Sequence, residues 1–283
     1  MSDVPTSPEG LWQLAAHAQR AAAVAAEHIR SRRPHSIEHK ETGGDYVASQ
    51  VVTEVDRQAE ALIVQTLQPA LEGLGLLTEE RPDDGSRLRA PAFWCIDPLD
   101  GTLAYIRGER GPAVSVGLVR RDGVPLIGVI VDVVTGQRIA GVRGGGVAVD
   151  GTPWRHGAPS GSLRVFGDHS FEDKPAYRSV TDRLGAADVH VGQAAVLNAW
   201  SVLASPPAVY FKFPRTGRGG GSLWDYAATA CCFGEAGCVA TTFAGDPLPL
   251  NRPDTTFLAD CGVMFASDSG LAAQVRSAAA SPP

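Results

Sequence analysis

Two carboxylates at the end of an apolar run are the residues of this sequence best suited to chemistry. The run Phe93 to Ile96 leads into the segment Asp97-Pro98-Leu99-Asp100-Gly101-Thr102. Hard cations such as Mg²⁺ prefer oxygen ligands, so Asp97, Asp100 and the intervening Leu99 carbonyl form a candidate half-site for such an ion. Aspartates before a helix are also typical of a capped turn, and this segment alone does not separate the two interpretations.

The residues that follow the second carboxylate suit an anion. Gly101 permits an unusual turn, and Thr102 to Ile106 is predicted to begin a helix. Free N–H groups at a helix start favour negative charge, so one turn would offer both metal ligands and phosphate donors. This combination predicts hydrolysis of a phosphate ester by metal-activated water, a reaction that needs no covalent nucleophile.

Further acids occur at the ends of predicted elements. Glu79 and Glu80 follow the apolar run Leu74 to Leu77, whereas Asp56 and Asp225 each lie at a predicted helix start. Taken singly, the two aspartates suit a helix N-terminus and the two glutamates suit a solvated pair. Taken together with the first carboxylate pair, their order and spacing are specific.

At these segments the sequence resembles the inositol monophosphatase superfamily. These are lithium-sensitive, magnesium-dependent phosphatases that include the 3'(2'),5'-bisphosphate nucleotidases. Any one segment is a weak signal, whereas four in the family's order are a strong one. The resemblance covers most of the chain and rests on Val52 to Asp56, Thr78 to Glu80, Asp97 to Thr102, and Trp224 to Ala228.

The resemblance implies a set of magnesium ligands. Glu79, Asp97 and the Leu99 carbonyl would hold one Mg²⁺ ion. Asp97, Asp100 and Asp225 would hold a second, so Asp97 would bridge the two ions. Glu79 would also help to place a third, weaker ion and its water. The expected cofactor is therefore two or three Mg²⁺ ions.

The resemblance also implies which residues act on water and phosphate. Thr102, paired with Asp56, would orient or deprotonate the attacking water, with Glu79 as the further catalytic residue. The backbone N–H groups of Gly101 and Thr102 would receive the phosphate. Asp225 would contact the substrate as well as a metal ion.

Three cations near the last acidic segment bear on the choice of substrate. Lys212, Arg215 and Arg218 stand where inositol monophosphatases usually carry an acidic residue. Guanidinium groups bind phosphate oxygens in pairs, so a second phosphate, as in adenosine 3',5'-bisphosphate, is favoured. Thr78 also matches the nucleotidases better than the inositol phosphatases. A solvated basic loop is the alternative, and an inositol or sugar monophosphate stays open as the substrate.

A second class of function is a non-catalytic family member that binds metal and anions without turnover. The intact acids and Thr102 argue against this interpretation, because degeneration usually removes a ligand first. The histidines are scattered and form no Ser/His/Asp or Cys/His arrangement. A phosphomonoesterase that acts on a small phosphorylated metabolite is therefore the predicted function.

Composition restricts the partners and the compartment. The net charge of −6 argues against binding a nucleic-acid polymer, which requires a basic face. The five cysteines form no CxxC pair, so a reducing compartment is expected. No apolar stretch is long enough to cross a membrane, and the first residues lack the order of a signal peptide. These features predict a cytoplasmic protein with no membrane partner.

The elements that must position these residues follow from apolar spacing. Helices are predicted over Pro8 to Arg30 and Val55 to Leu67, and short apolar runs from 74 to 142 predict a mostly antiparallel sheet. Alternating helical and strand patterns follow, so we expect an N-terminal α+β domain over 1–160 and a smaller α/β domain over 161–283. The resemblance implies the α/β/α/β/α sandwich of sugar phosphatases, in which homodimers are common.

Overall fold

The computed structural model describes residues 4–32, 37–39, 51–168, 171, 174–186, 188–217 and 221–280. The helices are α1 (Pro8–Arg30), α2 (Glu54–Leu67), α3 (Ser86–Arg89), α4 (Thr102–Arg107), α5 (Pro175–Arg183), α6 (Ala195–Ala204), α7 (Leu223–Ala236) and α8 (Ser269–Ala280), with a 3₁₀ turn at Gln68–Ala70. The strands are β1 (Ile37–His39), β2 (Val51–Thr53), β3 (Gly75–Thr78), β4 (Ala92–Asp100), β5 (Ala113–Arg120), β6 (Pro125–Asp132), β7 (Arg138–Val142), β8 (Gly146–Val149), β9 (Thr152–Trp154), β10 (Arg164–Gly167), β11 (Asp188–Val191), β12 (Ala208–Lys212), β13 (Val239–Thr241) and β14 (Val263–Ala266).

Within these residues the strands form a seven-stranded and a five-stranded sheet beside the small β1–β2 pair. The larger sheet runs from β3 to β9 in chain order, and only its β3–β4 pair is parallel. The prediction of a mostly antiparallel sheet is confirmed. The smaller sheet has the order β11-β10-β12-β14-β13, and β10 is parallel to both of its neighbours. None of the described helices is both long and apolar enough to cross a membrane.

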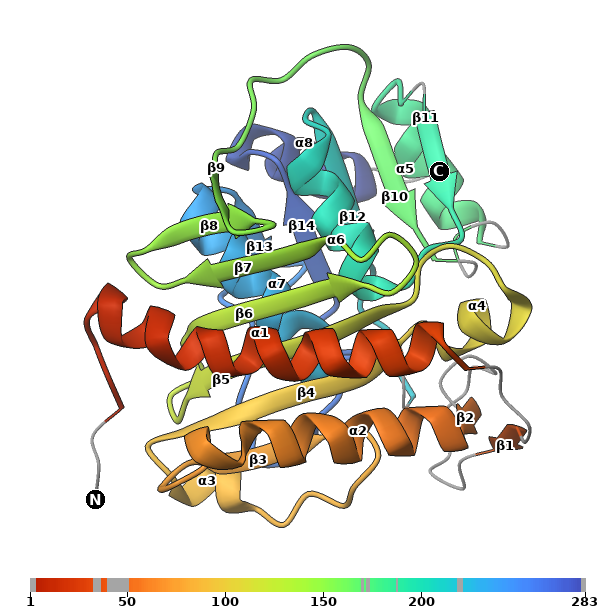
Figure 1. The fold of residues 1–283 in the computed structure, drawn as a ribbon. Helices are drawn as coiled ribbons and strands as arrows, with labels where there is room; N and C mark the ends of the chain where they lie inside the picture. Colours follow the sequence, from red (N-terminus) through yellow and green to blue (C-terminus); the bar gives the residue numbers. More distant parts are fainter. Residues whose placement is uncertain are drawn as a thin grey trace.

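The two sheets stack with helices between and outside them (Figure 1). Helices α1 and α2 cover the outer face of the larger sheet and share one core with it. Helices α6 and α7 lie in the central core between the sheets, and α5 and α8 close the far face of the smaller sheet. This is the α/β/α/β/α sandwich that the resemblance implied, and that prediction is confirmed.

A row of glycines lets α7 approach the larger sheet closely. Gly117, Gly128 and Gly141 are direct cross-strand neighbours on β5, β6 and β7. A Cβ atom on Gly128 would stand 2.0 Å from the Ala228 carbonyl oxygen of α7, a distance that no packed atoms tolerate. The row therefore determines how near α7 lies to the sheet, and with it the position of Asp225 in the first turn of α7.

Candidate active site

Strand β4 carries two acids into the interior on the same side. Its side chains are buried throughout, with Asp97 1% and Asp100 8% exposed. Residues three apart on a regular strand face opposite ways. Here the pairing with β5 moves from Asp97–Ser115 to Asp100–Ala113, so β4 has one residue more than β5 in that interval. This β-bulge brings both carboxylates to the face that looks toward α7.

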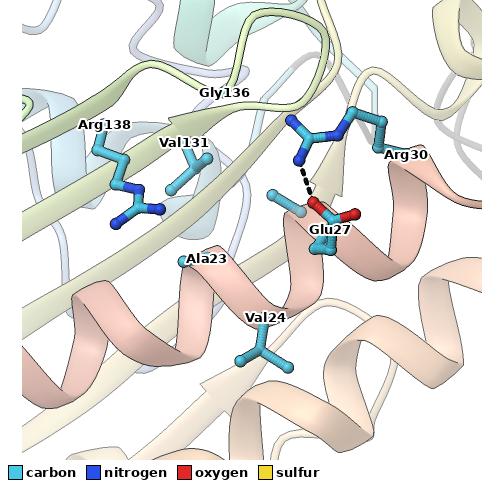
Figure 2. Close-up of a pocket in the computed structure, with 8 residues that line it drawn as sticks. Ala23, Val24, Glu27, Arg30, Val131, Gly136 and Arg138 are labelled. Carbon is cyan, nitrogen blue, oxygen red and sulfur yellow. Dashed lines mark hydrogen bonds and ion pairs between the residues drawn. The ribbon is translucent and has the colours of Figure 1, made fainter.

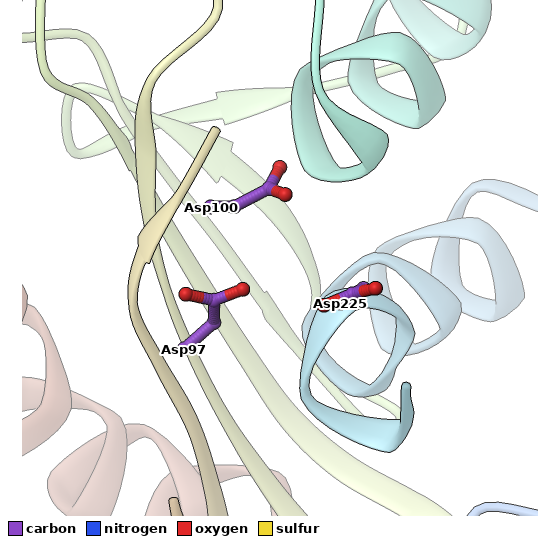
Figure 3. Close-up of side chains that lie close together, drawn as sticks. All are labelled: Asp97, Asp100 and Asp225. Carbon is purple, nitrogen blue, oxygen red and sulfur yellow. The ribbon is translucent and has the colours of Figure 1, made fainter. Parts of the chain in front are cut away.

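The acids of β4 meet a third acid on α7. One carboxylate oxygen from each of Asp97, Asp100 and Asp225 lies within 4.8 Å of the others. Figure 3 shows the two strand acids opposite Asp225 at the start of its helix. Asp225 is held by a capping box, in which the Ser222 N–H donates to its Oδ2 at 2.9 Å. Segments more than a hundred residues apart thus share one acidic cluster.

Backbone donors fix the two strand acids as well. The Leu99 N–H donates to Asp97 Oδ1 at 3.0 Å, and the Val196 N–H at the start of α6 donates to Asp100 Oδ2 at 2.7 Å. These bonds orient each carboxyl group. The cluster is therefore preorganised, and its oxygens are the donors that a hard cation prefers.

The pKa values of these acids follow from burial and mutual repulsion. Burial raises the pKa of Asp97 well above its usual range, and the charges of Glu79, Asp100 and Asp225 add to the effect. Burial and the charge of Asp225 likewise raise the pKa of Asp100. Burial and Glu79 raise the pKa of Asp225 to about 6, although Lys212 opposes them. A multivalent cation relieves this repulsion, so the cluster fits a divalent metal ion.

Glu79 stands at the edge of this cluster. It follows β3, which runs parallel to β4, and its backbone N–H donates to the Ile96 carbonyl at 3.2 Å. The half-buried side chain is not one of the three acids within 4.8 Å of one another, yet its charge acts on Asp97, Asp225 and Asp56. Its role as a metal ligand stays a prediction.

A hydroxyl beside the cluster is tied to a buried acid. Thr102 Oγ1 donates to Asp56 Oδ1 at 2.8 Å, with the Leu99 carbonyl as an alternative acceptor at 3.2 Å. Asp56 forms the capping box of α2 with Thr53, whose N–H donates to its Oδ2 at 2.9 Å. Burial raises the pKa of Asp56, and hydrogen bonds from Thr53 and Thr102 oppose the rise. The predicted Thr102–Asp56 pairing is present as a contact.

Gly101 occupies the turn between β4 and α4. Its φ of +87° lies in the left-handed region, and a Cβ atom there would come within 2.9 Å of the Ala194 side chain. Glycine is therefore required for both backbone conformation and space. The predicted contact of this turn with phosphate stays a prediction.

The three predicted cations differ in their placement. Lys212 ends β12, and its charge lowers the pKa values of Asp100 and Asp225. Arg215 is half-buried, and its guanidinium donates to the neighbouring Thr216 carbonyl at 3.4 Å. Arg218 lies outside the described residues. Of the predicted substrate-binding cations, Lys212 thus acts electrostatically on two acids of the cluster.

A surface hollow of about 380 Å³ lies elsewhere, between α1 and the strands β6 and β7. Its lining includes Ala23, Val131 and Arg138, and an ion pair joins Glu27 to Arg30 at its rim (Figure 2). None of the acids of the cluster lines it. We assign this hollow no part in the chemistry.

Comparisons with known proteins agree with this geometry. The inositol monophosphatase family profile matches residues 11–280. "Nus factor SuhB" of Pseudomonas aeruginosa is 32% identical over 208 residues, which cover 70% of this chain and 74% of that protein. The "3'-phosphoadenosine 5'-phosphate phosphatase" of Mycobacterium bovis is 32% identical over 206 residues, with 70% and 72% covered.

A solved structure extends the agreement to the fold. The inositol monophosphatase from Anabaena superposes with a TM-score of 0.74 at 23% identity and covers 96% of this chain and 98% of its own. At that identity the likeness concerns the fold alone, whereas the profile match spans nearly the whole sequence. The chain belongs to the inositol monophosphatase family and is a phosphatase.

Proposed function

We propose that this phosphatase hydrolyses a small phosphate monoester by a magnesium-dependent attack of water. The observation that carries the proposal is the group of three carboxylates, Asp97, Asp100 and Asp225, within 4.8 Å of one another. The family depends on metal ions, and an all-oxygen donor set of this kind favours Mg²⁺ over softer ions.

In this proposal the three acids would hold two or three Mg²⁺ ions, with Glu79 and the Leu99 carbonyl completing the set. When bound, such ions lower the pKa of water and stabilise charge on the entering and leaving oxygens. The chain's own contribution is the fixed arrangement of the acids. Their hydrogen bonds to Leu99, Val196 and Ser222 hold that arrangement before any ion arrives.

Thr102 would position the attacking water. Its hydroxyl donates to Asp56, so the lone pairs of its oxygen can accept a hydrogen bond from water. Asp56 is buried and anchored in the α2 capping box, and it therefore sets the rotamer of Thr102. The N–H groups of Gly101 and Thr102 would receive the phosphate, because both belong to the turn that follows Asp100.

A 3'(2'),5'-bisphosphate nucleotide is the proposed substrate. Lys212 supports it, since a half-buried ammonium whose charge lowers the pKa values of Asp100 and Asp225 suits a substrate with a second anionic group better than a polyol. The name of the Mycobacterium bovis relative points the same way. Inositol and sugar monophosphates are the alternative class. The family resemblance adds inhibition by Li⁺ and a homodimer to the proposal, and the composition adds a cytoplasmic location.

A phosphate-release panel tests this function. Adenosine 3',5'-bisphosphate, myo-inositol 1-phosphate and fructose 1,6-bisphosphate would each be assayed with Mg²⁺ and with EDTA. We expect the nucleotide to have the highest kcat/KM, and EDTA to abolish turnover of all three. Equal and negligible turnover of the three substrates in Mg²⁺ would reject the proposal.

Asp100→Asn tests the site within the same panel. The substitution weakens a proposed metal ligand, so kcat should fall about 10²-fold or more. The matched control is Asp122→Asn, which removes an exposed carboxylate paired with Arg120 and should leave kcat unchanged. Near-normal turnover of Asp100→Asn would place the chemistry elsewhere.

A further inference from the structure

The turn that follows β3 begins opposite the first acid of β4. Strands β3 and β4 are parallel, with Leu77 opposite Cys95 in the core between the sheets. The Glu79 N–H donates to the Ile96 carbonyl at 3.2 Å, which carries this pairing one residue past the end of β3. The same register places Glu79 opposite Asp97, and alternation along the strands puts both on the face of that core. Backbone contacts thus place Glu79 beside the acidic cluster.

Past Glu79, the chain is held by a buried acid of α2. Among the described residues β3 is the edge strand of the larger sheet, so the Glu80 N–H lies beyond any strand pairing. This N–H donates to Glu60 Oε2 at 2.9 Å, and Arg81 Nε donates to Glu60 Oε1 at 2.6 Å. The two oxygens of one carboxylate therefore hold the two residues that follow Glu79.

The Glu60 side chain is fixed by the fold. It is 4% exposed, whereas the side chain of Arg81 is 47% exposed. Glu60 lies one helical turn after Asp56, on the same face of α2. Since Asp56 accepts from Thr102, one face of α2 contacts both the hydroxyl and the turn after β3. A buried carboxylate that lost its donors would be unsatisfied, which favours keeping the turn in place.

We propose that Glu60 is a positioning residue for metal binding: it holds the turn formed by Glu80 and Arg81, and so keeps Glu79 beside Asp97. A residue that hydrogen-bonds the surroundings of a metal ligand sets the orientation of that ligand and the affinity of the site. Glu60 would thus act through Glu79 and not as a ligand itself. The inference rests on the proposed function only in treating Glu79 and Asp97 as metal ligands.

A double-mutant cycle on metal binding tests this role without any substrate. The full-length protein and its Glu60→Gln, Glu79→Gln and doubly substituted variants would be titrated with Mn²⁺ and followed by the electron paramagnetic resonance signal of free Mn²⁺. Glu60→Gln replaces one acceptor oxygen with a donor, so one of the two hydrogen bonds is lost and Mn²⁺ binding should weaken about tenfold. The double variant should bind as Glu79→Gln does, because Glu60 acts through Glu79.

Arg81→Met separates positioning from charge, and it changes a half-exposed side chain if Glu60→Gln does not fold. Removal of a positive charge near a cation site would by electrostatics alone tighten Mn²⁺ binding. Loss of a donor that holds the turn should instead weaken it, about threefold for a half-exposed pair. Glu72→Gln is the matched control for the charge lost in Glu60→Gln. It removes an exposed carboxylate in the turn before β3 and should leave Mn²⁺ affinity unchanged.

Three results would overturn the positioning role. The first is wild-type Mn²⁺ affinity in Glu60→Gln or in Glu79→Gln, and the second is unchanged or tighter binding in Arg81→Met. The third is a double variant that binds about tenfold more weakly than Glu79→Gln alone. Failure of the proposed function would look different. Wild-type protein that binds no Mn²⁺ would refute the metal site together with this inference, whereas the expected Mn²⁺ affinities without phosphate release would refute the catalytic proposal alone.

Discussion

At the scale of single residues, the acids of this site serve two purposes. Asp56 and Asp225 each close a capping box at the start of a helix, which the sequence also predicts for an aspartate in that position. Asp56 meets Thr102, and Asp225 meets the acids of β4. A residue can therefore satisfy a local structural rule and still belong to the proposed functional site, and the second relation becomes visible only in the folded chain.

The role of Thr102 is testable by a change that keeps its shape. Thr102→Val removes the hydroxyl that donates to Asp56 at 2.8 Å, so we expect kcat to fall about 10²-fold as the water loses its positioning group. Thr102→Ser keeps the hydroxyl and should retain most activity. Steady-state kinetics on the preferred phosphate ester would measure both, and equal rates for the two variants would contradict the role.

The cost of crowding the acids is testable in metal-free protein. The pKa of Asp225 is raised from 3.8 to about 6, so the folded state binds protons more tightly than the unfolded state. Its ionised carboxylate thus destabilises the fold, and stability falls as pH rises through the window from about 4 to 6. Asp225→Asn should therefore melt at a higher temperature than wild type at pH 7 in EDTA.

With Mg²⁺ in place of EDTA, the wild type should melt at a higher temperature than Asp225→Asn, which is the reverse of the order expected in EDTA. If Mg²⁺ binds the proposed site, it should raise the melting temperature of the wild type, whereas Asp225→Asn lacks a proposed ligand and should gain little. At a pH well below 3.8 in EDTA the two proteins should melt alike, because Asp225 is protonated in both the folded and the unfolded state. Thermal unfolding at both pH values would check this. A variant that is less stable than wild type in EDTA at pH 7 would contradict it.

At the scale of elements, sequence patterns predicted those with strong apolar periodicity. The helix Pro8–Arg30 and the strands from 92 to 142 appear where the spacing placed them. Helix α5 was not predicted, because Pro175–Arg183 is largely polar and buries only a few side chains. Strand β10 and helix α8 were likewise missed, and α8 is rich in alanine and serine, which give little contrast between its faces.

The β-bulge in β4 is the part of the site that spacing could not reveal. A separation of three predicts opposite faces for Asp97 and Asp100 in a regular strand. The extra residue that reverses this outcome appears only in the pairing with β5. Pro98, which cannot donate a ladder hydrogen bond, is the one local signal for such an irregularity.

The glycine row yields a prediction about the position of α7. Gly128→Ala would place a Cβ atom 2.0 Å from the Ala228 carbonyl oxygen, so either the sheet or α7 must move. We expect a loss of about 3 kcal/mol in the free energy of unfolding, together with weaker Mg²⁺ binding. Chemical denaturation and metal titration would measure the two effects.

The control for that change lies on the same helix. Gly234 of α7 is exposed, and a Cβ atom added there would have no neighbour within 4 Å. Gly234→Ala should therefore stabilise the protein by about 1 kcal/mol through its helix propensity alone. If Gly128→Ala and Gly234→Ala changed the free energy of unfolding and Mg²⁺ binding equally, close packing of α7 on the sheet would not be the cause of the Gly128→Ala effect.

At the scale of the whole molecule, one core joins the two proposed halves of the chain. The central cluster contains Phe93 and Val119 of the larger sheet together with Tyr210 and Phe265 of the smaller one. Arg87, only 2% exposed, adds a polar link by donating to Asn251 Oδ1 at 2.7 Å. The proposed boundary at residue 160 is therefore crossed by extensive contacts.

This arrangement predicts a single cooperative unfolding transition. Two halves that share one buried core lose it together, so calorimetry in Mg²⁺ should show one peak whose calorimetric and van't Hoff enthalpies agree. Separate expression of residues 161–283 should give an unstable product for the same reason. Two resolved peaks would mean that the halves fold independently.

The central claim is that Asp97, Asp100 and Asp225 hold divalent metal ions for phosphate hydrolysis. Crystals soaked in Mn²⁺, measured at a wavelength where manganese scatters anomalously, test it most directly. We predict anomalous peaks within coordination distance of the oxygens of all three carboxylates. Well-diffracting crystals with no anomalous peak at this cluster, or with peaks only elsewhere on the protein, would contradict the account.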